Sequence, residues 1–120
     1  MRILVVDDSR AMRMIVIRSL RQAGYRDAEI VEASNGVEAL EVIRSSPPDV
    51  VLSDWNMPDM SGIELLRSVN AEGIAVPFGF VTSESTPPMR KQALEEGALF
   101  LLAKPFTAEA LEEALGAVVG

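Results

Sequence analysis

The chain has 120 residues, a formal net charge of −7, and neither cysteine nor histidine. This length fits one domain, and the negative charge argues against nonspecific nucleic-acid binding and against membrane binding through a basic face, because both depend on Lys and Arg. Without cysteine and histidine, disulfides, zinc–thiolate sites and the usual general base are excluded, so any chemistry must use carboxylates, hydroxyls and lysine.

Residues 1–6 are typical of a short strand and not of a secretory signal, which needs a longer apolar stretch and a small-residue cleavage site. No apolar run approaches the roughly 20 residues of a membrane span. We therefore expect a cytoplasmic protein without membrane association.

Apolar, β-rich runs alternate with helical patterns along the chain. In chain order, the first half predicts strands and helices alternately over residues 3–6, 9–24, 28–33, 36–45 and 50–53. Ser9 is placed to cap the first helix and Gly24 to end it in the left-handed conformation. The strand over 28–33 is the most polar and is expected at a sheet edge. The inward stripes of the two helices are predicted to be Met12, Ile15, Val16 and Leu20, then Val37, Leu40 and Ile43.

The second half of the chain predicts strands over 76–81 and 99–103 and three helices. Ser61 and Glu64 form a capping box for the first of these helices. Thr86 caps the next, with Pro87 at the first helical position, and Thr107 caps the last.

Five strands alternating with five helices predict a parallel sheet covered by helices on both faces. We expect a flavodoxin-like, doubly wound α/β domain over residues 1–120, with strand order 2-1-3-4-5. In such sheets, ligands bind beyond the carboxyl ends of the strands.

Every predicted strand except the polar one ends in a residue that can handle a phosphate or a metal. These residues are Asp7 and Asp8, Asp54, Thr82 and Lys104. Converging carboxylates repel one another, and Mg²⁺ relieves that repulsion while keeping waters and phosphate oxygens as further ligands. With a cation and a hydroxyl beside an aspartate nucleophile, the set suits phosphoryl transfer.

Taken singly, each of these residues has an ordinary explanation. The acidic pair could be a solvated loop or a helix cap, Asp54 a strand end, Thr82 a β-former and Lys104 a surface charge. Their joint placement at successive strand ends favours a site.

The strings VVDDS, LSDWNMPDMSG, VTSES and AKPF resemble the receiver domain of response regulators, over the whole chain. The string DWNMPDMSGIELL is most similar to single-domain chemotaxis response regulators. This resemblance implies that Asp54 accepts a phosphoryl group from a partner histidine kinase. It also implies a site for Mg²⁺, with Mn²⁺ as a substitute, built from Asp7, Asp8, Asp54 and the backbone carbonyl of Asn56.

The resemblance assigns roles to the residues around the acceptor as well. Thr82 corresponds to the hydroxyl that moves onto the phosphate, and Lys104 to the lysine that pairs with it, joined to Pro105 by a cis peptide bond. Asn56 and Glu84 occupy the two positions that tune dephosphorylation, and this pair implies a short-lived phosphorylated state.

The sequence departs from the family at Leu101, where many members carry the Tyr or Phe of a conformational switch. Phe100 is adjacent, but strand alternation points it to the opposite face. Leu101 is therefore either an ordinary strand residue or a smaller substitute for the aromatic ring. Trp55 is expected to be partly exposed at the rim of the site, and Gly79 suggests no function.

We expect a signalling switch that assists its own phosphorylation and dephosphorylation and turns over no external substrate. Phosphorylation would bias the surface of the fourth helix, fifth strand and fifth helix toward an output protein. Three alternatives remain: the receiver part of a larger regulator with a DNA-binding or enzymatic output domain, a receiver that no longer accepts phosphate, and an aspartyl phosphatase. The last normally needs a second Asp two residues after the nucleophile, where this chain has Asn56.

Overall fold

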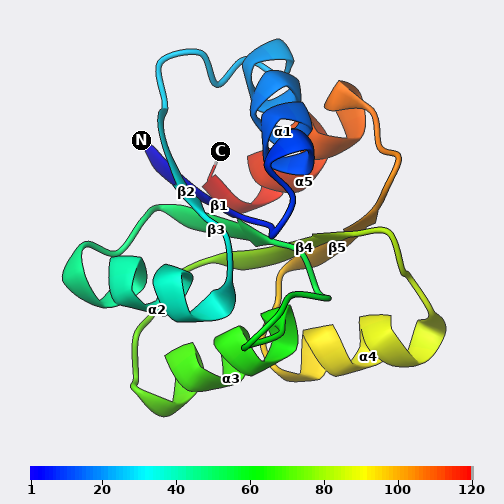
Figure 1. Cartoon of the computed structure of the whole chain (residues 1–120). Helices are drawn as coiled ribbons and strands as arrows, with labels where there is room; N and C mark the ends of the chain where they lie inside the picture. The colour runs from blue at the N-terminus through cyan, green and yellow to red at the C-terminus, as the bar shows by residue number, and fades with distance from the viewer. Residues whose placement is uncertain (120) are drawn as a thin grey trace.

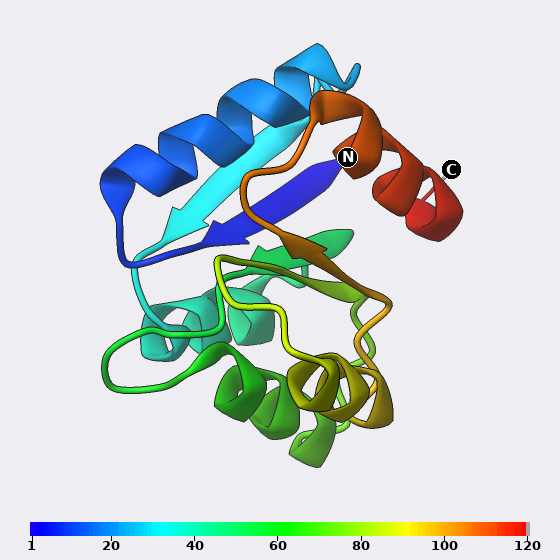
Figure 2. The same ribbon diagram turned by 90° about the vertical axis from the view of Figure 1, so that its right-hand side faces the viewer.

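The computed structural model describes residues 1–119, and the side chains of residues 1–118, as three layers with a central sheet. In chain order its elements are β1 (Arg2–Val6), α1 (Arg10–Gln22), β2 (Glu29–Ala33), α2 (Gly36–Ser45), β3 (Val50–Ser53), α3 (Gly62–Ala71), β4 (Phe78–Thr82), α4 (Pro87–Glu95), β5 (Phe100–Ala103) and α5 (Ala108–Val119). Helices α1 and α5 cover one face of the sheet, and α2, α3 and α4 cover the other (Figure 1). Figure 2 shows the same layers from the side.

The strand order is β2-β1-β3-β4-β5, and every pair of neighbours is parallel. This confirms the predicted fold class, the strand order and the edge position of the polar strand. Hydrogen bonds continue past the strand ends, since the Asp54 N–H donates to Val6 O at 2.9 Å and the Lys104 N–H donates to Thr82 O at 2.8 Å. The loops that follow β1, β3 and β5 therefore leave the same edge of the sheet.

Two hydrophobic cores lie on opposite faces of the sheet, because alternate strand residues point to opposite sides. Ile3 and Val5 of β1 pack with α1 and α5, whereas Leu4 packs with α2, α3 and α4. On β5, Leu101 faces the α4 side and Phe100 the α1 and α5 side, as predicted.

Helix caps form where the sequence predicts them. The Ser9 and Thr107 hydroxyls accept N–H donors from the first turns of α1 and α5, and Ser61 with Glu64 makes the capping box of α3. Gly24 follows α1 with φ of 105°, which explains the glycine at that position.

Some predicted boundaries and burials were wrong. Strand β4 covers Phe78–Thr82 and not 76–81, because Pro77 has no N–H to donate to a ladder. β2 and β5 begin one residue later than predicted. Ile15 and Val37 were expected to face inward, yet each is 47% exposed, since both lie on helix flanks that the sheet does not cover.

Gly79 has a packing role that the sequence did not reveal. It pairs in register with Phe100 on β5, and the Phe100 ring lies across it. A Cβ atom at position 79 would stand 2.2 Å from the ring carbon Cζ of Phe100. The glycine therefore makes room for the neighbouring aromatic side chain. Among the described residues, no helix is long and apolar enough to cross a membrane.

Candidate functional site

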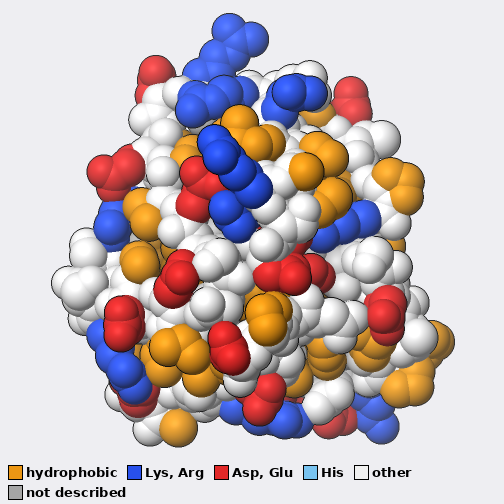
Figure 3. Space-filling view, viewed as in Figure 1, with side chains coloured by type: hydrophobic (Ala, Val, Ile, Leu, Met, Phe, Trp, Pro, Cys, Tyr) orange, Lys and Arg blue, Asp and Glu red, His pale blue; other side chains and the backbone are white. Residues whose placement is uncertain are grey.

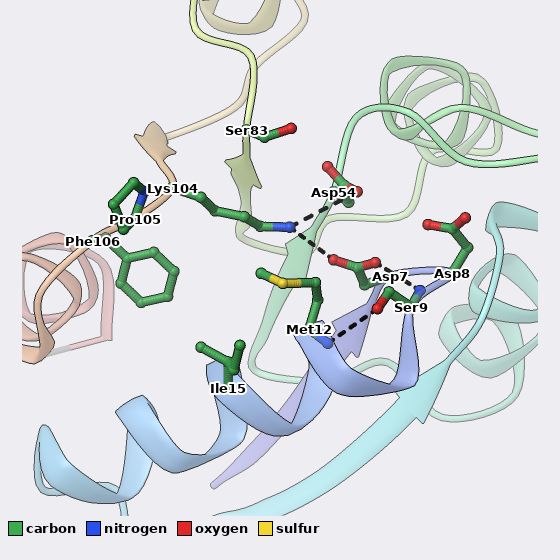
Figure 4. Close-up of a pocket in the computed structure, with 10 residues that line it drawn as sticks. All are labelled: Asp7, Asp8, Ser9, Met12, Ile15, Asp54, Ser83, Lys104, Pro105 and Phe106. Atoms are coloured by element: carbon green, nitrogen blue, oxygen red, sulfur yellow. Dashed lines mark hydrogen bonds and ion pairs between the residues drawn. The ribbon is translucent and has the colours of Figure 1, made fainter.

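Three carboxylates meet at the carboxyl edge of the sheet. Asp7 and Asp8 follow β1, Asp54 follows β3, and one oxygen of each lies within 4.8 Å of the others (Figure 4). Asp7 is buried, Asp54 is half-buried and Asp8 is exposed. Carboxylate oxygens are the ligands that Mg²⁺ prefers, so the donor set fits the predicted cation.

Lys104 places its ammonium between two of these carboxylates. Its Nζ atom lies 2.9 Å from Asp7 Oδ2 and 3.9 Å from Asp54 Oδ2, and its side chain is 11% exposed. The other oxygen of Asp7 accepts the Ser9 N–H at 2.9 Å. The Lys104–Pro105 peptide bond is cis, as the resemblance implied.

The environment of Asp54 perturbs its ionisation. Burial raises the pKa of the Asp54 carboxyl above its ordinary value, and the Asp7 carboxylate adds to the rise. The Lys104 ammonium is the main influence in the opposite direction, followed by the Trp55 N–H, which donates to Asp54 Oδ1 at 2.7 Å, and by the Thr82 hydroxyl. The surrounding groups therefore compensate the negative charge of the Asp54 carboxylate only in part, which favours the binding of a cation beside it.

Next to the acceptor, hydrogen bonds connect three further predicted residues: Thr82, Glu84 and Asn56. Thr82 is fully buried, and its hydroxyl oxygen accepts the Glu84 N–H at 3.2 Å. The Asn56 side-chain amide donates to Glu84 Oε1 at 3.0 Å, which ties the loop after β3 to the loop after β4. The sequence placed both loops near the site but did not predict this bond. The backbone carbonyl of Asn56 stays a predicted metal ligand.

Leu101 lies apart from this cluster. It is 6% exposed and packs in the core on the α4 side, and its backbone oxygen accepts Arg90 Nη1 at 3.3 Å.

A groove of about 440 Å³ opens next to the carboxylates. Figure 4 shows the lining residues, which come from the start of α1, the strand ends and the segment after β5: Asp7, Asp8, Ser9, Met12, Ile15, Asp54, Ser83, Lys104, Pro105 and Phe106. On the surface of this face, acidic side chains lie near the centre, and Lys and Arg gather over α1 (Figure 3). The sequence missed Ser9, Met12, Ile15, Ser83 and Phe106 as site residues, although Ser9, Ser83 and Phe106 each directly follow a predicted one.

Two residues next to the acceptor have roles that the sequence did not indicate. Trp55 was expected to be partly exposed, but it is 8% exposed and its ring packs on Phe80 with 4.9 Å between centroids. Gly62 begins α3 directly against the acceptor, since its N–H donates to Trp55 O at 2.8 Å and an added Cβ would lie 2.1 Å from Asp54 O. Together they fix the backbone that presents the Asp54 side chain.

Comparisons with known proteins agree with this geometry. The family model of the response regulator receiver domain matches residues 3–116. Chemotaxis protein CheY1 of Helicobacter pylori (strain J99) is 38% identical in an alignment 123 positions long, which covers all of this chain and 98% of that protein. The chemotaxis protein CheY homolog of Campylobacter jejuni is 39% identical, over all of this chain and 93% of that protein.

Solved structures show the same fold. Vibrio cholerae chemotaxis protein CheY4 superposes with a TM-score of 0.86 at 34% identity, covering 98% of both chains. The signal receiver domain of the putative response regulator NarL from Mycobacterium tuberculosis gives a TM-score of 0.86 at 32% identity, covering 97% of this chain and 93% of that one. The sequence match, the fold and the acidic site together show that this chain belongs to the response regulator receiver domain family.

Proposed function

We propose that this chain is a phospho-accepting signalling switch. Asp54 takes a phosphoryl group from the phosphohistidine of a histidine kinase, and the phosphorylated domain, formed by residues 1–120, binds an output protein. One observation carries the proposal: three carboxylates share one edge of the sheet with the Lys104 ammonium, which lies 2.9 Å from Asp7 and 3.9 Å from Asp54. The names of the relatives favour a role in chemotaxis.

In the proposed transfer, an Asp54 carboxylate oxygen attacks the phosphorus atom. The new O–P bond forms as the P–N bond to the donor imidazole breaks, and the imidazole nitrogen keeps the electron pair and takes a proton from solvent. Lys104 pairs with a phosphoryl oxygen, and the Thr82 hydroxyl donates to another. Mg²⁺, held by Asp7, Asp8, Asp54 and the Asn56 carbonyl, would neutralise charge on the carboxylates and the phosphoryl oxygens.

The proposed switch begins at Thr82, which lies at the end of β4 and directly before the loop that leads to α4. When its hydroxyl turns to the phosphate, its bond with the Glu84 N–H must change. The loop then moves relative to α4, which biases the surface of α4, β5 and α5 toward the output protein. Because Leu101 stands in place of an aromatic ring, this coupling relies on a smaller side chain.

The Asn56–Glu84 hydrogen bond supports the proposed tuning role of these two residues. Both are exposed, and their bond spans the loops on either side of Asp54, where water would approach an acyl phosphate. We propose that this pair permits rapid hydrolysis and a short-lived signal.

Intact mass spectrometry tests the acceptor. The wild-type protein, incubated with acetyl phosphate and Mg²⁺, should gain one phosphoryl group, and chelation of the metal should prevent the gain. Asp54→Asn should gain none. Asp59→Asn is the matched control, because Asp59 lies further along the same loop, between β3 and α3, with φ of 68°, a conformation that Asn tolerates.

Two results would contradict the proposal. A phosphoryl group on Asp54→Asn would place the acceptor elsewhere. No gain by the wild-type protein, either from acetyl phosphate or from a phosphorylated kinase, would mean a receiver that does not accept phosphate.

A further inference from the structure

The three carboxylates of the site differ in how they are held. The Asp7 carboxylate accepts from Ser9 and Lys104, and the Asp54 carboxylate accepts from the Trp55 N–H. Among the described residues, none forms a hydrogen bond or an ion pair with the Asp8 carboxylate, which Figure 4 shows beside the other two. The backbone therefore fixes the direction in which the Cα–Cβ bond of Asp8 leaves the chain, and no side-chain contact adds to that restraint.

Arg13 of α1 holds the backbone directly before Asp8 through a hydrogen bond to the Asp7 carbonyl. Its Nη1 atom donates to the backbone oxygen of Asp7 at 2.7 Å, and its Nε atom donates to Glu32 Oε1 on β2 at 2.9 Å. The Arg13 side chain is 14% exposed and that of Glu32 is 43% exposed, so water competes less for the bond to Asp7 than for the bond to Glu32. The Asp7 N–H donates to Ala33 O at 3.1 Å, which holds the other end of the same residue.

The peptide plane carries this restraint to Asp8. The Asp7 carbonyl and the Asp8 N and Cα atoms belong to one planar unit. A guanidinium that holds the carbonyl oxygen therefore fixes the plane from which the Asp8 side chain leaves. Arginine suits this task because its planar group carries several donors at fixed angles, one for Asp7 and one for Glu32.

We infer that Arg13 is a positioning residue for divalent-cation binding, which orients Asp8 through the Asp7–Asp8 peptide and is itself held by Glu32. The inference rests on the proposed function only in requiring that the acidic site binds Mg²⁺. Glu32 also balances the charge of Arg13, so the guanidinium adds little repulsion against an incoming cation.

Mg²⁺ titration of four variants tests the inference. Binding is followed by the fluorescence of Trp55, the single tryptophan, which neighbours Asp54, and independently by calorimetry. Arg13→Gln should weaken Mg²⁺ binding by about tenfold or more, the loss typical when a residue that orients a metal ligand is removed. Arg13→Lys should also bind Mg²⁺ more weakly, because a lysine ammonium cannot donate to the Asp7 carbonyl and to Glu32 with the fixed geometry of a guanidinium. Glu32→Ala should show a smaller loss, and Arg18→Gln, an exposed site on the same helix, none.

A kinetic measurement separates positioning from general damage. With acetyl phosphate as donor, Arg13→Gln should need more Mg²⁺ for half the maximal phosphorylation rate but reach the wild-type rate at saturation, because Arg13 contacts no reacting atom. Thermal unfolding identifies any variant that fails to fold. If Arg13→Gln does not fold, the Mg²⁺ affinities of Arg13→Lys and Glu32→Ala test the positioning role of Arg13.

Several outcomes would overturn the inference. They are a Mg²⁺ affinity of Arg13→Gln equal to that of Arg18→Gln, a wild-type affinity in Arg13→Lys, and a rate defect in Arg13→Gln that persists at saturating Mg²⁺. Failure of the proposed function looks different: the wild-type protein would bind Mg²⁺ but take no phosphoryl group, and the titration would still decide the role of Arg13. A wild-type protein that binds no Mg²⁺ would end the inference itself.

Discussion

Replacing Lys104 with methionine should destabilise the protein in the absence of Mg²⁺. Methionine fills similar space but carries no charge, so Asp7 would lose its ionic partner while staying buried. The Lys104 and Asp7 side chains are only 11% and 4% exposed, so solvent screens their pairing weakly. Breaking a buried pair by removing one partner costs about 3–5 kcal/mol, because the other charge is left uncompensated.

We expect the lower end of that range, about 3 kcal/mol, since the Asp7 carboxylate keeps its hydrogen bond from the Ser9 N–H. Loss of the Lys104 ammonium also removes the main influence that lowers the pKa of the Asp54 carboxyl, so that pKa should rise further. The unfolding entropy of a domain of 120 residues is about 0.25 kcal/mol/K near 60 °C, so the melting temperature should fall by about 12 °C.

Thermal unfolding followed by circular dichroism measures this change, with Lys91→Met as the matched control. Lys91 is 79% exposed and pairs with Glu95 at 3.9 Å, so its replacement should alter stability by less than about 0.5 kcal/mol. Saturating Mg²⁺ should narrow the gap between Lys104→Met and the wild type, because the variant site is more negative and gains more from a bound cation. Equal shifts for the two lysine variants, or a gap that Mg²⁺ leaves unchanged, would refute this reasoning.

Three further predictions concern the acceptor and the sheet. Asp54→Asn should melt at a higher temperature than the wild type at pH 7 without Mg²⁺. Because the pKa of Asp54 is raised in the folded state, ionisation of this carboxyl lowers the stability of the wild type as pH rises, so the advantage of the variant should vanish well below the ordinary pKa of Asp. An advantage that grows on acidification would contradict this. Gly79→Ala should cost about 1–3 kcal/mol in urea unfolding, because the new methyl group meets the Phe100 ring, and the cost should shrink in a Phe100→Ala background; equal costs in both backgrounds would exclude the clash. Given Asn56 and Glu84, the phosphorylated protein should decay quickly when followed by quenched mass spectrometry, and persistence for hours would argue against the proposed tuning.

The position of the candidate site residues at one edge of the sheet could be predicted from the sequence, because strand ends are easy to locate. Asp54 and Lys104 each follow an apolar run, and parallel strands bring such ends to one edge. The helix caps are equally local, since Ser61 and Glu64 satisfy each other within four positions. These features depend on neighbours in the chain, which a sequence shows directly.

The features that the sequence missed depend on neighbours in space. Trp55 follows a charged residue and so suggested a rim position, yet its ring turns back onto Phe80 of the next strand. Gly79 has no meaning until the register sets it beside Phe100. Arg13 bonds a backbone carbonyl, which any residue could supply, so no sequence pattern marks the contact.

The contact between Lys104 and Asp7 joins residues 97 positions apart, which has a consequence for protein synthesis. The ribosome releases the N-terminal part of a chain first. All three carboxylates thus emerge long before Lys104, which pairs with Asp7 and Asp54, and β5, which carries that lysine into place, is the last strand to be made. An unfinished or prematurely terminated chain would therefore hold the buried Asp7 carboxylate without the ammonium group that pairs with it.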